Sequence, residues 1–136
     1  MNEQIAQWHG EPFCEYQSIP RDTCMNERLT DVVNRVLTLL IARQYGDVEI
    51  MTNGVRLDAE EIGRAIDEYG RQLIMPPPEG YRLMEAVNVK NARPSRWSIA
   101  MPLWTREEGR SDLTLEMTVI EQQNGFCIQL EDLHVL

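Results

Sequence analysis

The chain has 136 residues, of which 43% are apolar and 26% charged, so it can bury one hydrophobic core but is too short for two ordinary domains. Its 22 acidic and 13 basic side chains give a formal net charge of -9, which argues against nucleic acid and anionic membrane as partners. No apolar run approaches the length of a membrane-spanning helix, and the N-terminus has no secretion-signal pattern, so we expect a cytoplasmic protein.

The first third of the chain predicts an irregular arm followed by a helix. Residues 1–20 have no clean period and are expected to form an N-terminal arm that packs on the body. Over residues 22–45, apolar side chains recur at steps of three and four, which is typical of an amphipathic helix, and Gly46 is expected to end it. The apolar face of this helix would consist of Leu29, Val32, Val33, Val36, Leu37 and Leu40.

An Asn-Gly pair organises the next segment. Asn53 and Gly54 lie between two short apolar runs, residues 48–51 and 55–57. Asn-Gly is a strong hairpin signal because both residues tolerate the positive φ that a tight turn requires. The pattern therefore predicts a short two-stranded hairpin here.

A second helix is predicted directly after this hairpin. Asp58, with Glu61 three positions later, is typical of a capping box, in which each side chain satisfies a free backbone N–H group. Gly70 and the proline run 76–78 are expected to end the helix.

After the prolines the apolar period changes from that of a helix to two, which indicates β-strands. The spacing predicts four long strands joined by tight turns, one of them a second Asn-Gly turn, and a bulge near Asp132, where the alternation slips. The expected strands lie around residues 81–89, 97–103, 113–119 and 126–130.

These elements predict a single α+β domain covering residues 1–136. A helix–hairpin–helix unit over residues 22–80 would pack on one face of a curved antiparallel meander formed by residues 81–136. The order of the elements over residues 22–136 is similar to that of the ketosteroid-isomerase-like, or cystatin-like, cone fold. That resemblance implies a curved sheet that wraps the helices and leaves an open-ended pocket.

A second resemblance rests on short sequence strings. Leu103-Trp104-Thr105, the run from Glu107 to Leu115 and the C-terminal Asp132-Leu133-His134-Val135-Leu136 resemble the signature of an uncharacterised bacterial domain family. Tyr69-Gly70 with the following prolines also resembles that family. Small bacterial proteins of this kind often accompany polymorphic toxins, so the resemblance implies an immunity protein.

The densest polar cluster allows two interpretations. If the last two strands pair, Asp112 could contact His134, and this pair with Trp104 and Arg110 could form a ligand pocket or an acid–base site. Alternatively the cluster only shapes a turn, with Asp112 or Ser111 capping backbone groups and Arg110 pairing with neighbouring carboxylates.

Other signs of catalysis are weak. Positions expected to face inward are almost all apolar, with Glu85 as the main exception, so no catalytic residue is assigned. Cys14, Cys24 and Cys127 form no Cys-x-x-Cys pair, and His9 does not complete standard metal-ligand spacing, although one bridge between the first two cysteines stays open. We expect neither a metal nor a cofactor.

Charge is concentrated in residues 47–80, which hold eight acidic and three basic side chains. An acidic helix face here could bind a basic protein, or it could be a solvated surface with pairs such as Glu60–Arg64 and Asp67–Arg71. The first interpretation gives the main hypothesis, a protein-binding immunity module that neutralises a toxin, for example a nuclease with a basic cleft. Its partner-binding residues would be Glu60, Glu61, Asp67, Glu68, Glu107 and Glu108.

The alternative hypothesis is a binder or enzyme for a small hydrophobic ligand. Its pocket would contain Trp104, Arg110, Asp112 and His134. A homodimer through the open face of the sheet is compatible with either hypothesis.

Overall fold

A computed structural model of the chain describes residues 25–54, 56–123 and 125–135. The predicted N-terminal arm, with His9 and Cys14, lies outside these residues, and so does Cys24. The described helices are α1 (Met25–Ile41), α2 (Tyr45–Thr52), α3 (Ala59–Tyr69) and the short 3-10 helix η2 (Pro78–Leu83). The strands are β1 (Leu73–Ile74), β2 (Glu85–Asn88), β3 (Arg96–Thr105), β4 (Gly109–Gln122) and β5 (Gly125–Val135).

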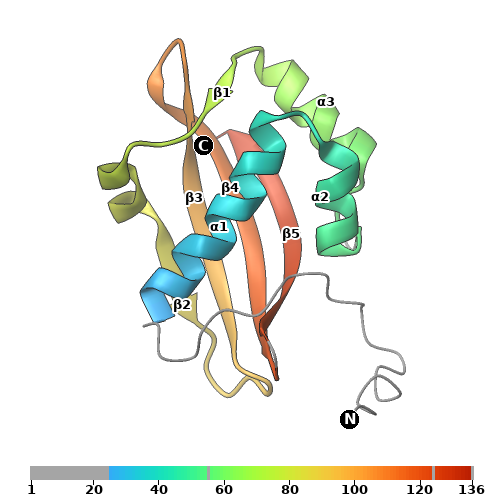
Figure 1. Cartoon of the computed structure of the whole chain (residues 1–136), viewed down its shortest axis with the longest axis vertical. Coiled ribbons are helices and arrows are strands. Elements are labelled where there is room, and N and C mark those ends of the chain that lie inside the picture. The colour runs from blue at the N-terminus through green and yellow to red at the C-terminus, as the bar shows by residue number, and fades with distance from the viewer. Residues whose placement is uncertain (1–24, 55, 124, 136) are drawn as a thin grey trace.

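The strands form one five-stranded antiparallel sheet that does not close into a barrel. Its order is β1-β3-β4-β5, and β2 pairs with β3 along the same edge as β1. The long strands β3, β4 and β5 follow each other as the predicted meander, and α1 runs diagonally across this sheet while α2 and α3 lie beside β5 (Figure 1). The predicted α+β class, with helices on an antiparallel sheet, is confirmed.

The core lies between α1 and the sheet, because both present an apolar face there. All six residues predicted for the apolar face of α1 are buried. They meet the odd-numbered residues of β4, which the strand pleat directs toward the helix. These strand residues are Leu113, Leu115, Met117 and Val119.

A buried cation attaches the first turns of α1 to the hairpin of β4 and β5. The Arg28 side chain is 7% exposed, and its guanidinium carbon lies 4.6 Å from the centroid of the Phe126 ring. Its Nη1 lies 3.6 Å from a carboxylate oxygen of Glu121. Ion pairing and the aromatic ring together offset the desolvation of this charge.

The predicted hairpin around Asn53 and Gly54 is wrong, because this segment is the helix α2. Both residues do adopt positive φ, at 61° and 57°, but there they end a helix instead of closing a β-turn. Val48 and Thr52, one helical turn apart, are buried, and the Thr52 hydroxyl donates to the Val48 carbonyl. Gly46 lies inside this helix, and α1 is instead followed by Arg43 in the left-handed conformation.

The strand predicted over residues 81–89 is also partly wrong. Its first half forms η2, which starts at Pro78, and only Glu85–Asn88 pairs with β3. Glu85 is exposed and does not face the core, since Ala86 takes the inward position opposite Ile99. The observed alternation is offset by one residue from the predicted one, so each side chain of this strand lies on the face opposite to the predicted face.

The bulge predicted near Asp132 is confirmed. Asp132 lies opposite Glu116 and Leu130 opposite Met117, so Glu131 is the extra residue in β5. Its carboxylate accepts hydrogen bonds from Arg56 Nε and the Thr118 hydroxyl, both at 2.9 Å. The loop before α3 is therefore attached to the edge strand at the bulge.

Candidate functional site

The acidic face of α3 is the largest group of exposed carboxylates predicted from the sequence. The helix buries Ile62 and Ile66 against the body, and the opposite side is solvent-exposed. The predicted partner-binding residues of this helix are all exposed: Glu60, Glu61, Asp67 and Glu68. The 3.6-residue period thus separates a buried apolar stripe from an acidic surface.

One of these carboxylates belongs to the start of the helix. The Glu61 side chain accepts from the Asp58 backbone N–H at 3.0 Å, and the Glu61 N–H donates to the Asp58 carboxylate at 2.8 Å. This is the predicted capping box. Glu61 therefore stabilises α3 and is less free to bind a partner than its neighbours.

Weak ion pairs cover part of the acidic face. The predicted pair between Glu60 and Arg64 is present at 3.8 Å. Asp67 lies 3.9 Å from Arg43, not beside Arg71 as predicted. All of these side chains are more than half exposed, so each pair contributes little to stability and can be exchanged for another partner.

A hollow of about 520 Å³ lies on the same face and is open to solvent. Tyr45 of α2 contributes one wall, and the other lining residues come from α3. A Cβ atom at Gly63 would lie 3.1 Å from Cδ2 of the Tyr45 ring, so the missing side chain makes room for that ring. The α3 residues of this hollow are Ala59, Glu60, Gly63, Arg64, Asp67 and Glu68.

Tyr45 and Gly63 were not predicted from the sequence as site residues. A signal was available, because an isolated glycine inside a helical pattern often has a packing reason. The ring that Gly63 accommodates could not be identified, since Tyr45 was placed at the end of the first helix and not at the start of α2.

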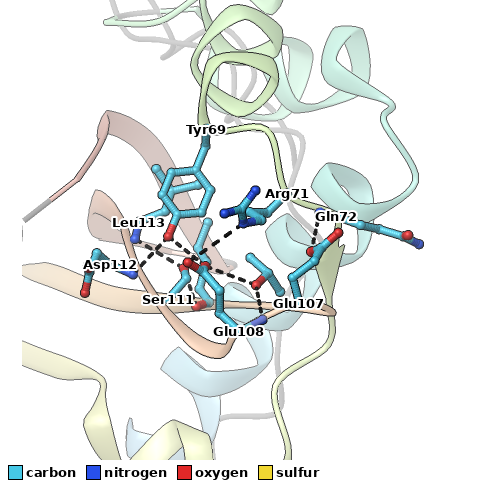
Figure 2. Close-up of polar contacts among 10 residues, drawn as sticks. Tyr69, Arg71, Gln72, Glu107, Glu108, Ser111, Asp112 and Leu113 are labelled. Carbon is cyan, nitrogen blue, oxygen red and sulfur yellow. Dashed lines mark hydrogen bonds and ion pairs between the residues drawn. The ribbon is translucent and has the colours of Figure 1, made fainter.

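The turn between β3 and β4 holds the second acidic group, and Figure 2 shows it beside the C-terminal end of α3. The Tyr69 hydroxyl donates to Oε1 of Glu108 at 2.8 Å and accepts from the Asp112 N–H at 3.3 Å. Burial and the bond to Glu108 both raise the pKa of Tyr69, so the phenol keeps its proton for this bond. Tyr69 directly follows Asp67 and Glu68, so the two acidic groups lie on adjacent segments.

The two carboxylates of the turn are bound to the protein itself. Glu108 also accepts from the Thr105 hydroxyl at 3.2 Å, and its cationic neighbour is Arg71, 3.9 Å away, where Arg110 was expected. Glu107 accepts from the Gln72 N–H at 3.0 Å. These contacts hold the turn against β1 and α3, as Figure 2 shows.

A bulge in β4 accounts for the next part of the polar cluster. The pairing of β3 with β4 shifts between Pro102 and Trp104, which leaves extra residues in β4. The buried Ser111 hydroxyl donates to the Leu103 carbonyl at 2.8 Å and accepts from the Leu113 N–H at 3.2 Å. Ser111 thus replaces ladder bonds that the bulge removes, which agrees with the structural interpretation of this segment.

The four residues of the alternative ligand pocket do not converge. Trp104 packs its ring edge against Gly80, while Arg110 and Asp112 are exposed. His134 is paired with Glu116, whose Oε2 lies 2.9 Å from His134 Nε2, and not with Asp112. The hydrogen bond to Glu116 raises the pKa of His134 above 6.5 despite partial burial, and Asp132 adds to this effect. None of the four lines the hollow beside α3.

Comparison with known proteins gives a family but no activity. Residues 37–136 match the family DUF7668, described as a domain of unknown function. No curated protein and no solved structure matches the chain, so its likeness to the cone fold stays a prediction. Among the described residues, no helix is long and apolar enough to cross a membrane, and no three His, Cys, Asp or Glu side chains gather as metal ligands.

Proposed function

The chain belongs to the DUF7668 family, and we propose that it acts in the cytoplasm as an acidic protein-binding module. Its partner would be a basic protein, in the first instance a bacterial toxin domain that it neutralises by direct binding. The observation that carries this proposal is the exposed acidic face of α3, which adjoins the acidic turn at Glu107 and Glu108.

Electrostatics supports a binding role for this surface. A net charge of -9 and an exposed set of carboxylates attract a basic surface over several ångströms and raise the association rate. A nuclease cleft that binds phosphate groups would present such a basic surface. The interaction should weaken as salt screens the charges.

The interior supports binding at the surface over chemistry in a pocket. The space between α1 and the sheet is packed with Leu, Ile, Val, Met and Phe side chains. The residues of the alternative pocket are dispersed, and His134 already has a carboxylate partner. No arrangement of the described residues therefore favours the small-ligand hypothesis over the binding module.

Three of the six acidic residues are suited to a clean test. Glu61 caps α3, and Glu107 and Glu108 hold the β3–β4 turn, so changing them would also perturb the fold. The other three are less constrained. Among the described residues, Glu60 and Asp67 form only exposed ion pairs, and Glu68 forms none. Reversal of Asp67 and Glu68 to Lys changes the surface with little structural cost.

The test first requires the partner. We suggest expressing the protein with the product of the neighbouring gene in the source organism, measuring growth, and measuring the Kd of the purified pair by calorimetry. The Asp67→Lys/Glu68→Lys variant should bind at least tenfold more weakly. The matched Glu79→Lys/Glu85→Lys variant, with the same charge change near the opposite edge of the sheet, should lose much less.

The affinity of the same complex should also depend on salt. Raising NaCl from 50 to 300 mM, roughly a twofold shorter screening length, should weaken the wild-type complex. If the α3 reversal left both affinity and protection of growth unchanged, the acidic-face proposal would be wrong.

A further inference from the structure

We infer that the hollow between Tyr45 and α3 receives a single arginine side chain of the basic partner. The inference rests on the proposed function and adds to it a defined anchor point on the acidic face. It starts from the shape of the hollow, which is open, shallow and walled by an aromatic ring. Such a site cannot enclose a small molecule, but it can receive a side chain that projects from another protein surface.

Small residues of α3 create the floor of the hollow. Ala59 and Gly63 lie one turn apart, so two consecutive turns lack a large side chain. The Tyr45 ring fills the part nearest Gly63, where ring carbons lie 3.1 and 3.2 Å from the position of a Cβ atom. The ring is thus held by close packing at the edge of an apolar strip.

The Tyr45 ring gives the hollow an uncharged aromatic wall. A tyrosine phenol is neutral at neutral pH, and burial raises the pKa of Tyr45 further above its usual value. Its oxygen is shielded from solvent and has no hydrogen-bond partner among the described residues. A methylene stem or a guanidinium plane can pack on such a ring, as arginine does on aromatic side chains.

Carboxylate side chains line the hollow. Glu60, Asp67 and Glu68 line it, against a single lining cation, Arg64. Both ion pairs that reach these carboxylates are long, at 3.8 and 3.9 Å, and involve exposed side chains. An arriving guanidinium could therefore take Asp67 or Glu68 as a bidentate partner without breaking a strong bond.

Arginine fits these features better than lysine. Its planar guanidinium can stack on the ring and bind a carboxylate through two parallel N–H groups, whereas the lysine ammonium is a compact, strongly hydrated charge. Binding should thus depend on both the ring and the carboxylates, and not on net charge alone.

The first experiment uses a hexa-arginine peptide as probe, with hexa-lysine and hexa-citrulline as controls. Each peptide is titrated into the full chain labelled with nitrogen-15, and Kd is taken from shifts of backbone amides. We expect hexa-arginine to shift the amides of Gly63 and its neighbours, hexa-lysine to bind several-fold more weakly, and the uncharged peptide not to bind. Equal binding of arginine and lysine peptides, or shifts spread over the whole acidic surface, would overturn the inference.

Variants then separate the anchor from the general acidic face. Tyr45→Leu removes the ring but no charge and should weaken hexa-arginine binding about two- to fivefold. Asp67→Asn/Glu68→Gln should weaken it further, and Glu79→Gln/Glu85→Gln should have little effect. Gly63→Ala, which pushes on the ring without removing it, gives a second probe of the wall if Tyr45→Leu lowers stability.

The outcomes distinguish the inference from the proposed function. If Tyr45→Leu and Gly63→Ala bind like the wild type while the carboxylate variant does not, the acidic face binds cations but the hollow is no anchor. If none of the variants affects the peptide but the natural partner still requires Asp67 and Glu68, the arginine anchor fails and the binding module stands. If the partner does not require them either, both fail.

Discussion

The hydroxyl of Tyr69, in the last turn of α3, donates a 2.8 Å hydrogen bond to the Glu108 carboxylate, which lies 39 positions later in the β3–β4 turn. The same oxygen accepts from the Asp112 backbone N–H at 3.3 Å. One side chain thus connects a helix end, a turn and the start of a bulge. This contact brings the acidic turn beside the acidic face of α3.

Tyr69→Phe should therefore destabilise the protein by about 0.5–1.5 kcal/mol, toward the lower end because the contact is partly solvated. Urea unfolding followed by circular dichroism would measure the change. The amides of Glu108 and Asp112 should shift in the NMR spectrum, because the turn loses its contact with α3. Tyr81→Phe offers a comparison on α1 and η2, where the hydroxyl contacts Asn34, and it should leave these amides unchanged.

Substitution of glycine by alanine is expected to have opposite effects on stability at Gly80 and at Gly46. A Cβ atom at Gly80 would lie 2.9 Å from the Trp104 ring and 3.1 Å from Pro76, so Gly80→Ala should destabilise by about 1–3 kcal/mol. Gly46 lies inside α2 with no atom within 4 Å of the added carbon, so Gly46→Ala should stabilise by about 0.5–1 kcal/mol. Thermal unfolding of both variants checks the pair, and a stable Gly80→Ala protein would contradict the packing described for Trp104.

The capping box makes a third prediction. Asp58→Ala removes the acceptor for the Glu61 N–H and should cost about 1 kcal/mol of stability. Glu61→Gln keeps an acceptor for the Asp58 N–H and should cost less. Hydrogen exchange should show the loss in the first turn of α3, and equal effects of the two substitutions would argue against a reciprocal cap.

The pair of His134 and Glu116 makes stability depend on pH. The pKa of His134 in the folded protein is raised above 6.5, chiefly by the hydrogen bond to Glu116. The folded state then binds the proton more tightly than the unfolded state, so this contribution is fully present below pH 6.5 and is lost as pH rises through the raised value. Unfolding by urea at a series of pH values should show this loss.

Substitutions can show which carboxylate raises the pKa of His134, that of Glu116 or that of Asp112. Glu116→Gln should lower the pKa of His134 toward 6.5 and flatten the pH dependence, as measured by NMR titration of the ring protons. Asp112→Asn should leave the pKa of His134 unchanged. A large change in the pKa of His134 in the Asp112→Asn variant would instead support the Asp112–His134 contact that was predicted from the sequence.

Local sequence patterns determined most of the regular elements. The apolar steps from Leu29 to Leu40 gave the buried face of α1, and Asp58 with Glu61 gave the start of α3. The change to a period of two gave β3, β4 and β5, and the slip near Asp132 gave the bulge. These features depend on residues within a few positions of one another, so the sequence contains their cause.

Tertiary structure decided the remaining elements and every contact between segments. Asn53 and Gly54 adopt positive φ, as predicted, but such a pair can close a hairpin or end a helix, and the burial of Val48 and Thr52 selected the helix. His134 pairs with Glu116 because Thr114 lies opposite His134, which places Glu116 diagonally beside it on the same face. A strand period of two cannot specify that register, since only packing against distant residues distinguishes one alignment from the next. The same holds for Tyr45, whose place beside Gly63 depends on how two helices meet and not on the residues that flank either one.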